Sequence, residues 1–493
     1  MPESERELKV VIVGAGTSGL MLAVMLELGG IDYVLLEKKP AFRPASRGLI
    51  LGPLILPLME QIGILREIKD ISLPARKFKI QRWDNPGESV GEIDASFVEE
   101  RYGYPFMIVP RPALYNVLLS KIPKHKILLG KRVLSTSQSD LGVLVRCADG
   151  STFSGDVLVG ADGTNSSVRQ NLYRQPEVSN TSTPPTPPSA DERNGPDTTW
   201  TVMGITNPLD KDLYPDMGQP YSDFVAMMGQ KSREVLWFMP TANRRLLWAI
   251  ITPVEKSDKA LCDDGFMATD LGPEAIEEMC SKYQHFGCPI GGTMKDMFDQ
   301  SPPHLMSKNL TNNRVYDKWC GGRTVLVGNA VHKFLPSAGL NDSLNMVESV
   351  ALANRLHELE SNGFHEIRAT FEQYQENMEP LARRVVQLSR RLDSTFTEQA
   401  SPHEIEDAAA VQKSNLRVRF QGVVAGLSRR VNLIRTAEAN WGKANDQVHK
   451  DRLQATFLPM VPQRGELFRH DPKPSSMPRR LRKKSSGIYR QES

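Results

Sequence analysis

Residues 10–37 read VVIVGAGTSGLMLAVMLELGGIDYVLLE, and this stretch decides how the rest of the chain is interpreted. It opens with a short β-branched run that is typical of a strand buried on both faces. A G-x-G-x-x-G loop follows, then a helical segment over Leu20–Leu28 and a second strand over Tyr33–Leu36. The order strand, glycine loop, helix, strand predicts a parallel βαβ unit.

The glycine loop and the end of the second strand predict a ligand. Gly14 permits the tight turn, Gly16 lets the backbone approach a pyrophosphate, and Gly19 lets the helix pack against the strand. The helix N-terminus offers N–H groups to phosphates, and the Glu37 carboxylate can accept from both ribose hydroxyls while repelling a 2′-phosphate. The unit therefore predicts a site for the ADP half of FAD or NAD, not of NADP. The alternative is a glycine-rich turn that holds no ligand.

The composition argues against several other classes of protein. The 493 residues include 61 basic and 58 acidic side chains, so a net charge of +3 gives no global field that favours nucleic acid. Five scattered cysteines form no C-x-x-C pair, which argues against a disulfide framework or a metal site. We therefore expect a reducing, cytoplasmic location and no metal. No run approaches roughly 18 uninterrupted apolar residues, so we expect no transmembrane segment.

Two later strands also end in glycine. Residues 156–163 (DVLVGADG) and 325–328 (VLVG) each have the pattern of a buried strand followed by a glycine turn. In a doubly wound sheet the carboxyl ends of parallel strands meet along one edge, where ligands bind. We expect Gly14, Gly160 and Gly328 to meet at such an edge.

Together these motifs resemble the single-component FAD-dependent monooxygenases of the para-hydroxybenzoate hydroxylase superfamily. The similarity is greatest to the fungal branch that epoxidises or hydroxylates polyketide and terpenoid intermediates of secondary metabolism. Residues 160–169 (GADGTNSSVR) resemble the family's aspartate–glycine motif, and Arg111 begins a segment similar to its arginine helix. Residues 328–339 (GNAVHKFLPSAG) resemble its third motif, and the order of all four motifs agrees over roughly residues 8–390.

The resemblance implies an α/β fold in which a Rossmann-type FAD-binding domain carries an inserted antiparallel-sheet substrate domain and a helical C-terminal region. It implies non-covalent FAD, with NADPH or NADH as a transient reductant. In the family, O2 adds at flavin C4a and the hydroperoxide transfers one oxygen atom to a small polyketide- or terpenoid-like substrate. The residues expected to contact FAD are Gly14, Gly16, Gly19, Glu37, Arg47, Gly48, Arg111, Asp162, Gly163, Asn329, Gly339 and Asp342. The alternatives are a solvated loop charge for Arg47 and a plain turn residue for Asp162.

The third motif departs from the family at two places. Asn329 stands where the family has aspartate, and Gly339–Ser343 replaces the usual glycine-rich turn. An amide still donates and accepts hydrogen bonds, so FAD binding need not fail. Two alternatives stay open: a flavin oxidase or dehydrogenase, and a degenerate flavoprotein that acts as a non-redox cyclase or scaffold.

Catalytic side chains are hard to see in the sequence, because the flavin carries the chemistry. Tyr221 lies where some relatives have a substrate-activating tyrosine; the alternative is an ordinary aromatic residue of the sheet. His332 is interpreted as a structural hydrogen-bonding residue or as an active-site residue. Trp237 and Trp248 fit either a core position or a platform for the substrate. The sequence gives no substrate identity and no oligomeric state.

Composition also divides the chain. A proline-rich stretch predicts a disordered linker, and clustered basic residues near the end predict a disordered tail. Residues 48–64 are expected to begin as a turn and end as a short helix. The predicted parts are an FAD-binding domain at 8–75, 105–172 and 315–395, a substrate-binding sheet domain at 76–104 and 200–314, a linker at 173–199, a helical C-terminal region at 396–470 and a basic tail at 471–493.

Overall fold

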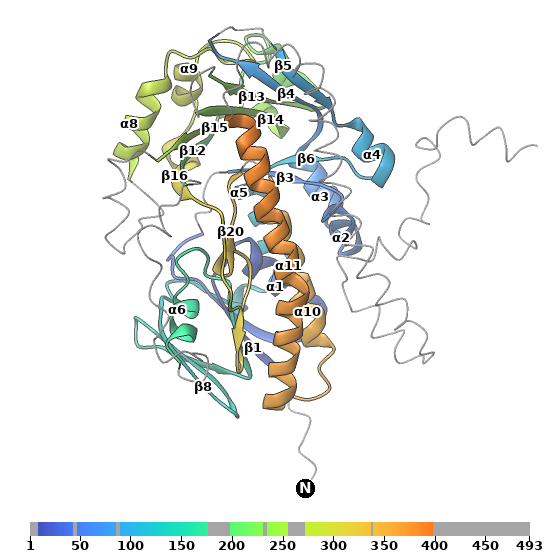
Figure 1. Ribbon diagram of the computed structural model, residues 1–493, viewed down its shortest axis with the longest axis vertical. Coiled ribbons are helices and arrows are strands. Elements are labelled where there is room, and N and C mark those ends of the chain that lie inside the picture. The colour runs from blue at the N-terminus through green and yellow to red at the C-terminus, as the bar shows by residue number, and fades with distance from the viewer. Residues whose placement is uncertain are drawn as a thin grey trace, which may run out of the picture.

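The computed structural model describes residues 8–42, 47–84, 89–175, 198–229, 234–254, 272–336 and 339–397. The predicted linker, C-terminal helical region and basic tail lie almost entirely outside these ranges. The described chain forms two units stacked along the long axis of the molecule (Figure 1). The N-terminal strand belongs to the lower unit, and the larger sheet belongs to the upper unit.

The lower unit is built on a six-stranded sheet, whose strands in spatial order are β18 (Cys320–Gly321), β19 (Thr324–Leu326), β11 (Val157–Gly160), β1 (Lys9–Val13), β2 (Asp32–Leu36) and β7 (Ile127–Leu128). Strands β19, β11, β1, β2 and β7 run parallel, and β18 is antiparallel to β19. Val10, Val11 and Ile12 of β1 are fully buried, as a β-branched strand covered on both faces requires. Helix α1 (Thr17–Leu28) follows β1 and packs against α10 (Asn341–His357). The predicted doubly wound arrangement is confirmed.

The upper unit is built on a nine-stranded sheet, whose strands in spatial order are β16 (Met306–Thr311), β12 (Thr199–Ile205), β15 (Arg245–Pro253), β14 (Val235–Thr241), β13 (Ser222–Met228), β4 (Leu73–Arg82), β6 (Met107–Pro110) and β3 (Gly48–Leu51), with β5 (Ser89–Asp94) paired to β4. Strands β13 and β4 run parallel, and every other neighbouring pair is antiparallel. The inserted sheet expected from the strand patterns is therefore present.

The two faces of this upper sheet have different surroundings. On the outer face, Phe238 and Trp248 pack with helices α8 (Pro273–Tyr283) and α9 (Met294–Asp299). On the inner face, Phe224 and Trp237 form a second cluster that includes Ile108 of β6. Because side chains alternate along a strand, each central strand contributes to both clusters. The inner face is the one that meets β6 and β3.

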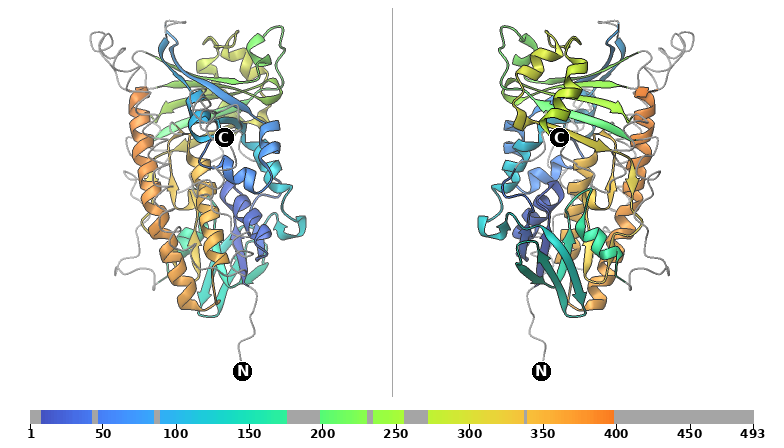
Figure 2. Two further views of the ribbon diagram at one scale, coloured as in Figure 1. Left: turned by 90° about the vertical axis from the view of Figure 1, so that its right-hand side faces the viewer. Right: turned by 90° about the vertical axis from the view of Figure 1, so that its left-hand side faces the viewer.

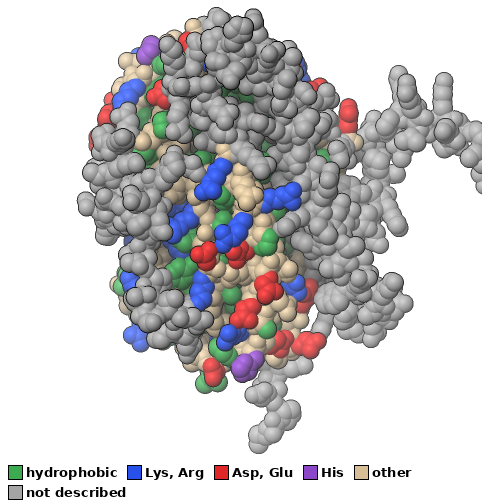
Figure 3. Space-filling view, viewed as in Figure 1, with side chains coloured by type: hydrophobic (Ala, Val, Ile, Leu, Met, Phe, Trp, Pro, Cys, Tyr) green, Lys and Arg blue, Asp and Glu red, His purple; other side chains and the backbone are tan. Residues whose placement is uncertain are grey.

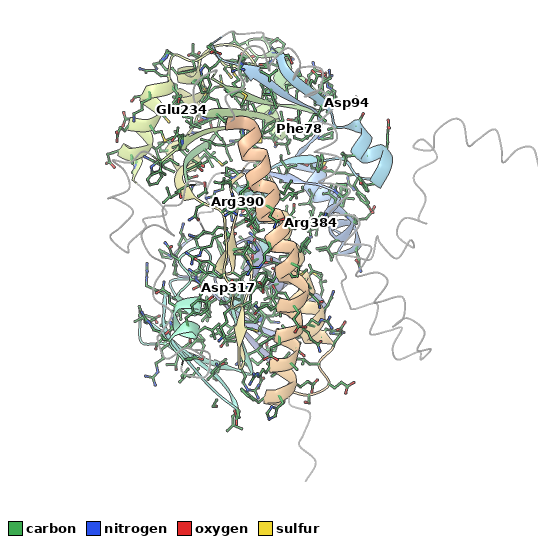
Figure 4. All side chains as sticks on the ribbon, in the orientation of Figure 1. Phe78, Asp94, Glu234, Asp317, Arg384 and Arg390 are labelled. Carbon is green, nitrogen blue, oxygen red and sulfur yellow. The ribbon has the colours of Figure 1, made fainter. Side chains whose placement is uncertain are left out.

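A long helix joins the two units. Helix α11 (Phe364–Thr397) runs beside both of them, as two further views show (Figure 2). Its outer side carries charges of both signs (Figure 3), including the i,i+4 ion pair between Arg368 and Glu372. Asp317, labelled in Figure 4, lies beside this helix and pairs with Arg383 at 2.8 Å. Exposed ion pairs of this kind add little to the free energy of folding. The packing of α11 against the two units therefore depends mainly on its buried apolar side.

The remaining elements complete the outline. The short pair β17–β20 precedes α10, and a three-stranded sheet β10-β9-β8 lies at the lower end (Figure 1). Their bounds, with those of the shorter helices, are β8 (Val133–Ser139), β9 (Gly142–Cys147), β10 (Thr152–Gly155), β17 (Arg314–Val315), β20 (His332–Lys333), α2 (Leu56–Gln61), α3 (Leu65–Asp70), α4 (Ser96–Tyr102), α5 (Arg111–Leu119) and α6 (Ser167–Tyr173). Within the described ranges, no helix is long and apolar enough to cross a membrane.

One local prediction is wrong. The sequence pattern of residues 48–51 predicts a turn, but these residues form strand β3, which pairs with β6 in antiparallel register. The partner strand lies about 60 residues away in the chain, so its effect is invisible to local patterns. Both β3 and β6 come from ranges predicted for the FAD-binding domain, yet they extend the upper sheet. Together with α11, they therefore connect the two units.

Candidate active site

Three strand ends meet at one edge of the lower sheet, as expected. Gly14 N donates to Leu36 O at 2.7 Å, and Ala161 N donates to Val13 O at 2.8 Å. A Cβ atom on Gly14, whose φ is +103°, would lie 2.5 Å from Ala161 O. Only glycine fits there, so the glycine loop and the aspartate–glycine motif are packed directly against each other. The third strand joins them through the bond from Val327 N to Gly160 O, at 3.0 Å.

The loop leaves room and free donors where a phosphate would bind. A Cβ on Gly16 would meet nothing closer than Tyr115 Oη at 3.8 Å, so no protein atom demands a glycine at this position. The N-terminus of α1 has no side-chain cap and no acidic residue in its first turn. Uncapped N–H groups at a helix start are suited to an external anion.

The Glu37 side chain lies beside the glycine loop. Its Oε2 accepts from Ala15 N at 2.8 Å, and its Oε1 accepts from Lys39 N at 2.9 Å. These two bonds fix the carboxylate against the glycine loop. Each carboxylate oxygen has a second lone pair, so both can still accept from ribose hydroxyls.

A buried polar network joins three distant parts of the chain. Thr17 Oγ1 donates to Asp342 Oδ1 at 2.5 Å and accepts from Arg111 Nη2 at 3.2 Å. Arg111 and Asp342 also form an ion pair at 3.4 Å, and Tyr115 Oη lies 3.3 Å from Thr17 Oγ1. Burial acts to lower the pKa of Arg111, but Asp342 and Tyr115 raise it overall, so the guanidinium keeps its charge. The structure thus brings the predicted Arg111 and Asp342 together at the start of α1.

Several buried polar atoms beside this network have no partner among the described residues. They are Arg111 Nε, Asn341 Oδ1 and Asn345 Oδ1. Buried groups of this kind are rare and require an explanation. The hydroxyl groups and phosphate oxygens of FAD offer both donors and acceptors for them. The residues present therefore fit the cofactor that the resemblance implies.

The unpartnered groups of Arg111, Asn341 and Asn345 are called the cradle below. Asn329 lies next to it, in the short turn Gly328–Ala330. Its Oδ1 accepts from Asn345 Nδ2 at 3.3 Å. Asn345 is only 2% exposed, and sequence reasoning did not single it out. The available signal was a run of polar residues on one face of α10, made up of Asn341, Asp342, Asn345, Glu348 and Ser349.

The carboxylate of Glu348 is hydrogen-bonded to the same turn. Its Oε2 accepts from Gly328 N at 2.9 Å, and its Oε1 lies 2.7 Å from His332 Nε2. Glu348 and His332 are both completely buried. The geometry favours the structural interpretation of His332. Gly328 itself has φ +62°, and a Cβ there would lie 2.0 Å from Ser18 Oγ, so the turn requires glycine.

Asp162 has a local task in the structure. Its Oδ2 accepts from Ser167 N at 2.7 Å and from Val168 N at 3.2 Å, and its Oδ1 accepts a hydrogen bond from Ser166 Oγ. These bonds cap the N-terminus of α6. The adjacent Gly163 has φ +79° and open space around it. A contact between either residue and FAD stays a prediction.

The remaining predicted residues lie around β3. Arg47 O accepts from Arg111 N at 2.9 Å, which ties the start of β3 to the arginine helix. A Cβ on Gly48 would lie 2.9 Å from Met239 Cε, and one on Gly339 would lie 3.2 Å from Ile50 Cδ1. The third-motif turn, β3 and the inner face of the upper sheet are therefore in close contact.

Tyr221 is placed differently. Its ring lies 3.6 Å from the guanidinium carbon of Arg76, a partly exposed residue that forms an ion pair with Asp223. This contact is with the sheet surface and not with the network around Arg111. A catalytic role for Tyr221 stays a prediction, and the structure adds no support for it.

The chain is similar to known proteins along most of its described length. Residues 7–187 match the FAD binding domain family model. The FAD-dependent monooxygenase cle3 of Aspergillus versicolor is 30% identical over 359 residues, which are 71% of this chain and 68% of that protein. The FAD-dependent monooxygenase nodM of Hypoxylon pulicicidum is 28% identical over 370 residues, 72% of each chain.

Solved structures share the fold. Klebsiella pneumoniae HpxO complexed with FAD and uric acid has a TM-score of 0.65 at 19% identity, and the match covers 84% of this chain and 95% of that one. The 2,6-dihydroxypyridine-3-hydroxylase from Arthrobacter nicotinovorans has a TM-score of 0.62 at 18% identity, with 81% and 95% covered. The chain belongs to the FAD-dependent monooxygenases, in the branch represented by these fungal relatives.

Proposed function

We propose that this enzyme inserts one oxygen atom from O2 into a largely apolar secondary-metabolite intermediate, by epoxidation or hydroxylation, with NADPH or NADH as the reductant. One observation supports this above the others: the cradle of unpartnered buried groups around Arg111 adjoins the apolar inner face of the upper sheet through β3. Bound FAD supplies the activation of O2 and the oxygen transfer.

The chain's own residues position the reactants. The start of α1, with Gly16, would hold the pyrophosphate, and Glu37 would accept from the ribose hydroxyls. Arg111, Asn341 and Asn345 would hold the ribityl side, because each has an unpartnered buried polar atom. Asn345 is hydrogen-bonded to Asn329, so the Asn329 turn would share in this contact. The inner sheet face would exclude water from the reacting atoms, since its central residues are buried and apolar.

A cationic cluster supports the use of a phosphate-bearing reductant. Arg314 and Lys333 stand directly opposite each other in the β17–β20 pair. The guanidinium carbons of Arg169 and Arg314 lie 4.1 Å and 4.6 Å from the centre of the Tyr316 ring. Within the described residues, none of these three cations forms an ion pair with a carboxylate. Like charges this close are unfavourable unless an anion joins them.

The pKa of Lys333 reflects this environment. Burial and the two neighbouring arginines lower it from 10.5 to about 7. A phosphate group would restore the charged form. Arg169 is itself fixed by bonds to Ala330 O at 2.7 Å and Thr164 O at 2.8 Å. We therefore infer that Lys333 and Arg314, rather than the fixed Arg169, would bind a phosphate group of the reductant.

Labelled oxygen tests the proposed reaction. A host that makes the pathway intermediate would be grown under ¹⁸O₂ with and without the full chain. We expect a new product that carries one ¹⁸O atom. A product formed without label would indicate a dehydrogenase or a cyclase, and hydrogen peroxide without an oxygenated product would indicate an oxidase. Absence of flavin from the purified protein would favour the non-redox alternative.

A further inference from the structure

Two tryptophans on neighbouring strands have different hydrogen-bonding states. Trp248 on β15 points to the outer face, where its Nε1 donates to Ser301 Oγ at 2.9 Å. Its ring also packs edge-on against Phe298, with 4.9 Å between the ring centres. Trp248 is therefore a satisfied core residue.

Trp237 on β14 points to the inner face. It pairs with Ala249 on β15, and its ring packs edge-on against Phe224 at 5.5 Å. Only 7% of Trp237 is exposed, and its Nε1 is buried without an acceptor among the described residues. An indole N–H can only donate, so nothing in the described protein satisfies it. Buried indole groups almost always find a partner.

The surroundings of Trp237 place it beside the active site. Met239 follows it by two residues on the same face, and Met239 touches Gly48 of β3. Ile50, also on β3, contacts Gly339 in the third-motif turn. A short path of contacts thus leads from the turn of the cofactor site to the Trp237 indole.

The same face carries a second unsatisfied polar atom. Ser222 Oγ on β13 is buried without a partner among the described residues. Ser222 lies four positions before Ala226, which pairs with Trp237, so the two backbone positions are about 13 Å apart along the sheet. Thr241 on the same face is already satisfied, because its Oγ1 donates to Ile108 O at 2.9 Å. The buried apolar members of the face include Met203, Phe224, Ala226, Met239, Leu247 and Ala249.

We propose that Trp237 Nε1 donates a hydrogen bond to an oxygen atom of the substrate, and that Ser222 makes a second polar contact at the other end of the face. The substrate is then an extended, mainly apolar molecule that carries at least one accepting oxygen, such as a ketone, ether or hydroxyl group. This inference rests on the proposed function and assigns a substrate-positioning role to Trp237. Trp248 provides the matched control.

Unfolding measurements test the hydrogen-bonding state without any ligand. Trp237→Phe and Trp248→Phe remove the same atoms, but only the second change breaks a hydrogen bond inside the protein. Relative to the native protein, we expect the urea midpoint of unfolding to fall less in Trp237→Phe than in Trp248→Phe. An equal or larger fall for Trp237→Phe would overturn the inference, because it would show that Nε1 has a structural partner.

Binding measurements test the substrate class. FAD-loaded enzyme would be titrated with terpenoid ketones and with the matching hydrocarbons, and binding would be followed by flavin absorbance. We expect ketones to bind about fivefold more tightly than their hydrocarbons, as one neutral hydrogen bond provides. Trp237→Phe should abolish this preference, and Trp248→Phe should retain it.

The outcomes separate this inference from the proposed function. Failure of every ketone to bind, or a preference that survives in Trp237→Phe, would contradict the role of Trp237. Binding with the expected preference but without any oxygenated product would leave that role in place and contradict the monooxygenase reaction on these compounds.

Discussion

Replacing Glu348 by alanine should destabilise the protein by about 3–5 kcal/mol, as expected when one partner of a buried pair is removed. Glu348 is completely buried, and its carboxylate is the acceptor for Gly328 N and the partner of His332 Nε2. Each buried donor left without a partner costs about 1–3 kcal/mol. The change also opens a cavity in a region where Tyr374 and Trp319 are almost fully buried.

The assay is urea-induced unfolding of the FAD-free protein, followed by circular dichroism. Glu348→Gln is the matched variant, because glutamine can still accept from Gly328 N and donate to His332. We expect Glu348→Gln to lose less than half of what Glu348→Ala loses. A loss below about 1 kcal/mol for Glu348→Ala would refute the reasoning, since this is the lower limit for even one unsatisfied group. Equal losses in both variants would show that the hydrogen bonds are not the cause.

The same substitution should weaken FAD binding. Glu348 fixes the Gly328 turn, and that turn carries Asn329 into the cradle. Titration of both variants with FAD at a temperature where each is folded separates this effect from global stability. Unchanged affinity in folded Glu348→Ala would mean that the turn keeps its shape without the carboxylate.

Three further predictions concern single residues. Glu37→Arg should weaken FAD binding at least tenfold, because a donor replaces the acceptor of ribose hydroxyls at ~1.5–3 kcal/mol per charge-assisted bond; unchanged affinity in a flavin titration would contradict this. Asn329→Asp should raise the affinity for FAD about fivefold, because Asn345 Nδ2 already lies 3.3 Å from Asn329 Oδ1 and would stabilise a carboxylate there. Weaker FAD binding would show that the turn is adapted to the amide. Folding lowers the pKa of Lys333 from 10.5 to about 7, so the unfolded state binds more protons between these two pH values. The native chain should therefore gain stability over Lys333→Met as the pH rises above about 7. A difference that does not change with pH in urea titrations would exclude a buried, titrating lysine.

Much of the framework follows from short sequence patterns. A buried strand that ends in a glycine turn is recognisable in itself, and parallel strands place their carboxyl ends on one edge. The meeting of Gly14, Gly160 and Gly328 was therefore predictable. The alternation of side chains along a strand likewise gives the two faces of the upper sheet. This alternation does not show which face of the sheet the helices cover.

The missed features depend on contacts between distant parts of the chain. Strand β3 exists because β6 pairs with it, and its local pattern resembles a turn. Glu348 gains its role from Gly328 and His332, and the sequence shows it only as one of several polar residues in a helix of mixed composition. Trp237 and Trp248 look alike in the sequence, and what distinguishes them is the sheet face each occupies and the acceptor that Ser301 offers to Trp248 alone.

Thr17, Arg111 and Asp342 come from three separate segments and meet at the start of α1, where we propose that FAD binds. Titration of the flavin-free full chain with FAD, followed by calorimetry, tests this proposal most directly. Arg111→Met is compared with Arg76→Met, which changes an arginine of the sheet surface. We predict one non-covalent FAD per native chain, about tenfold or greater weakening by Arg111→Met from the loss of a charge-assisted bond, and no change by Arg76→Met. Absence of FAD uptake by the native chain, or equal affinity in native protein and Arg111→Met, would contradict the account.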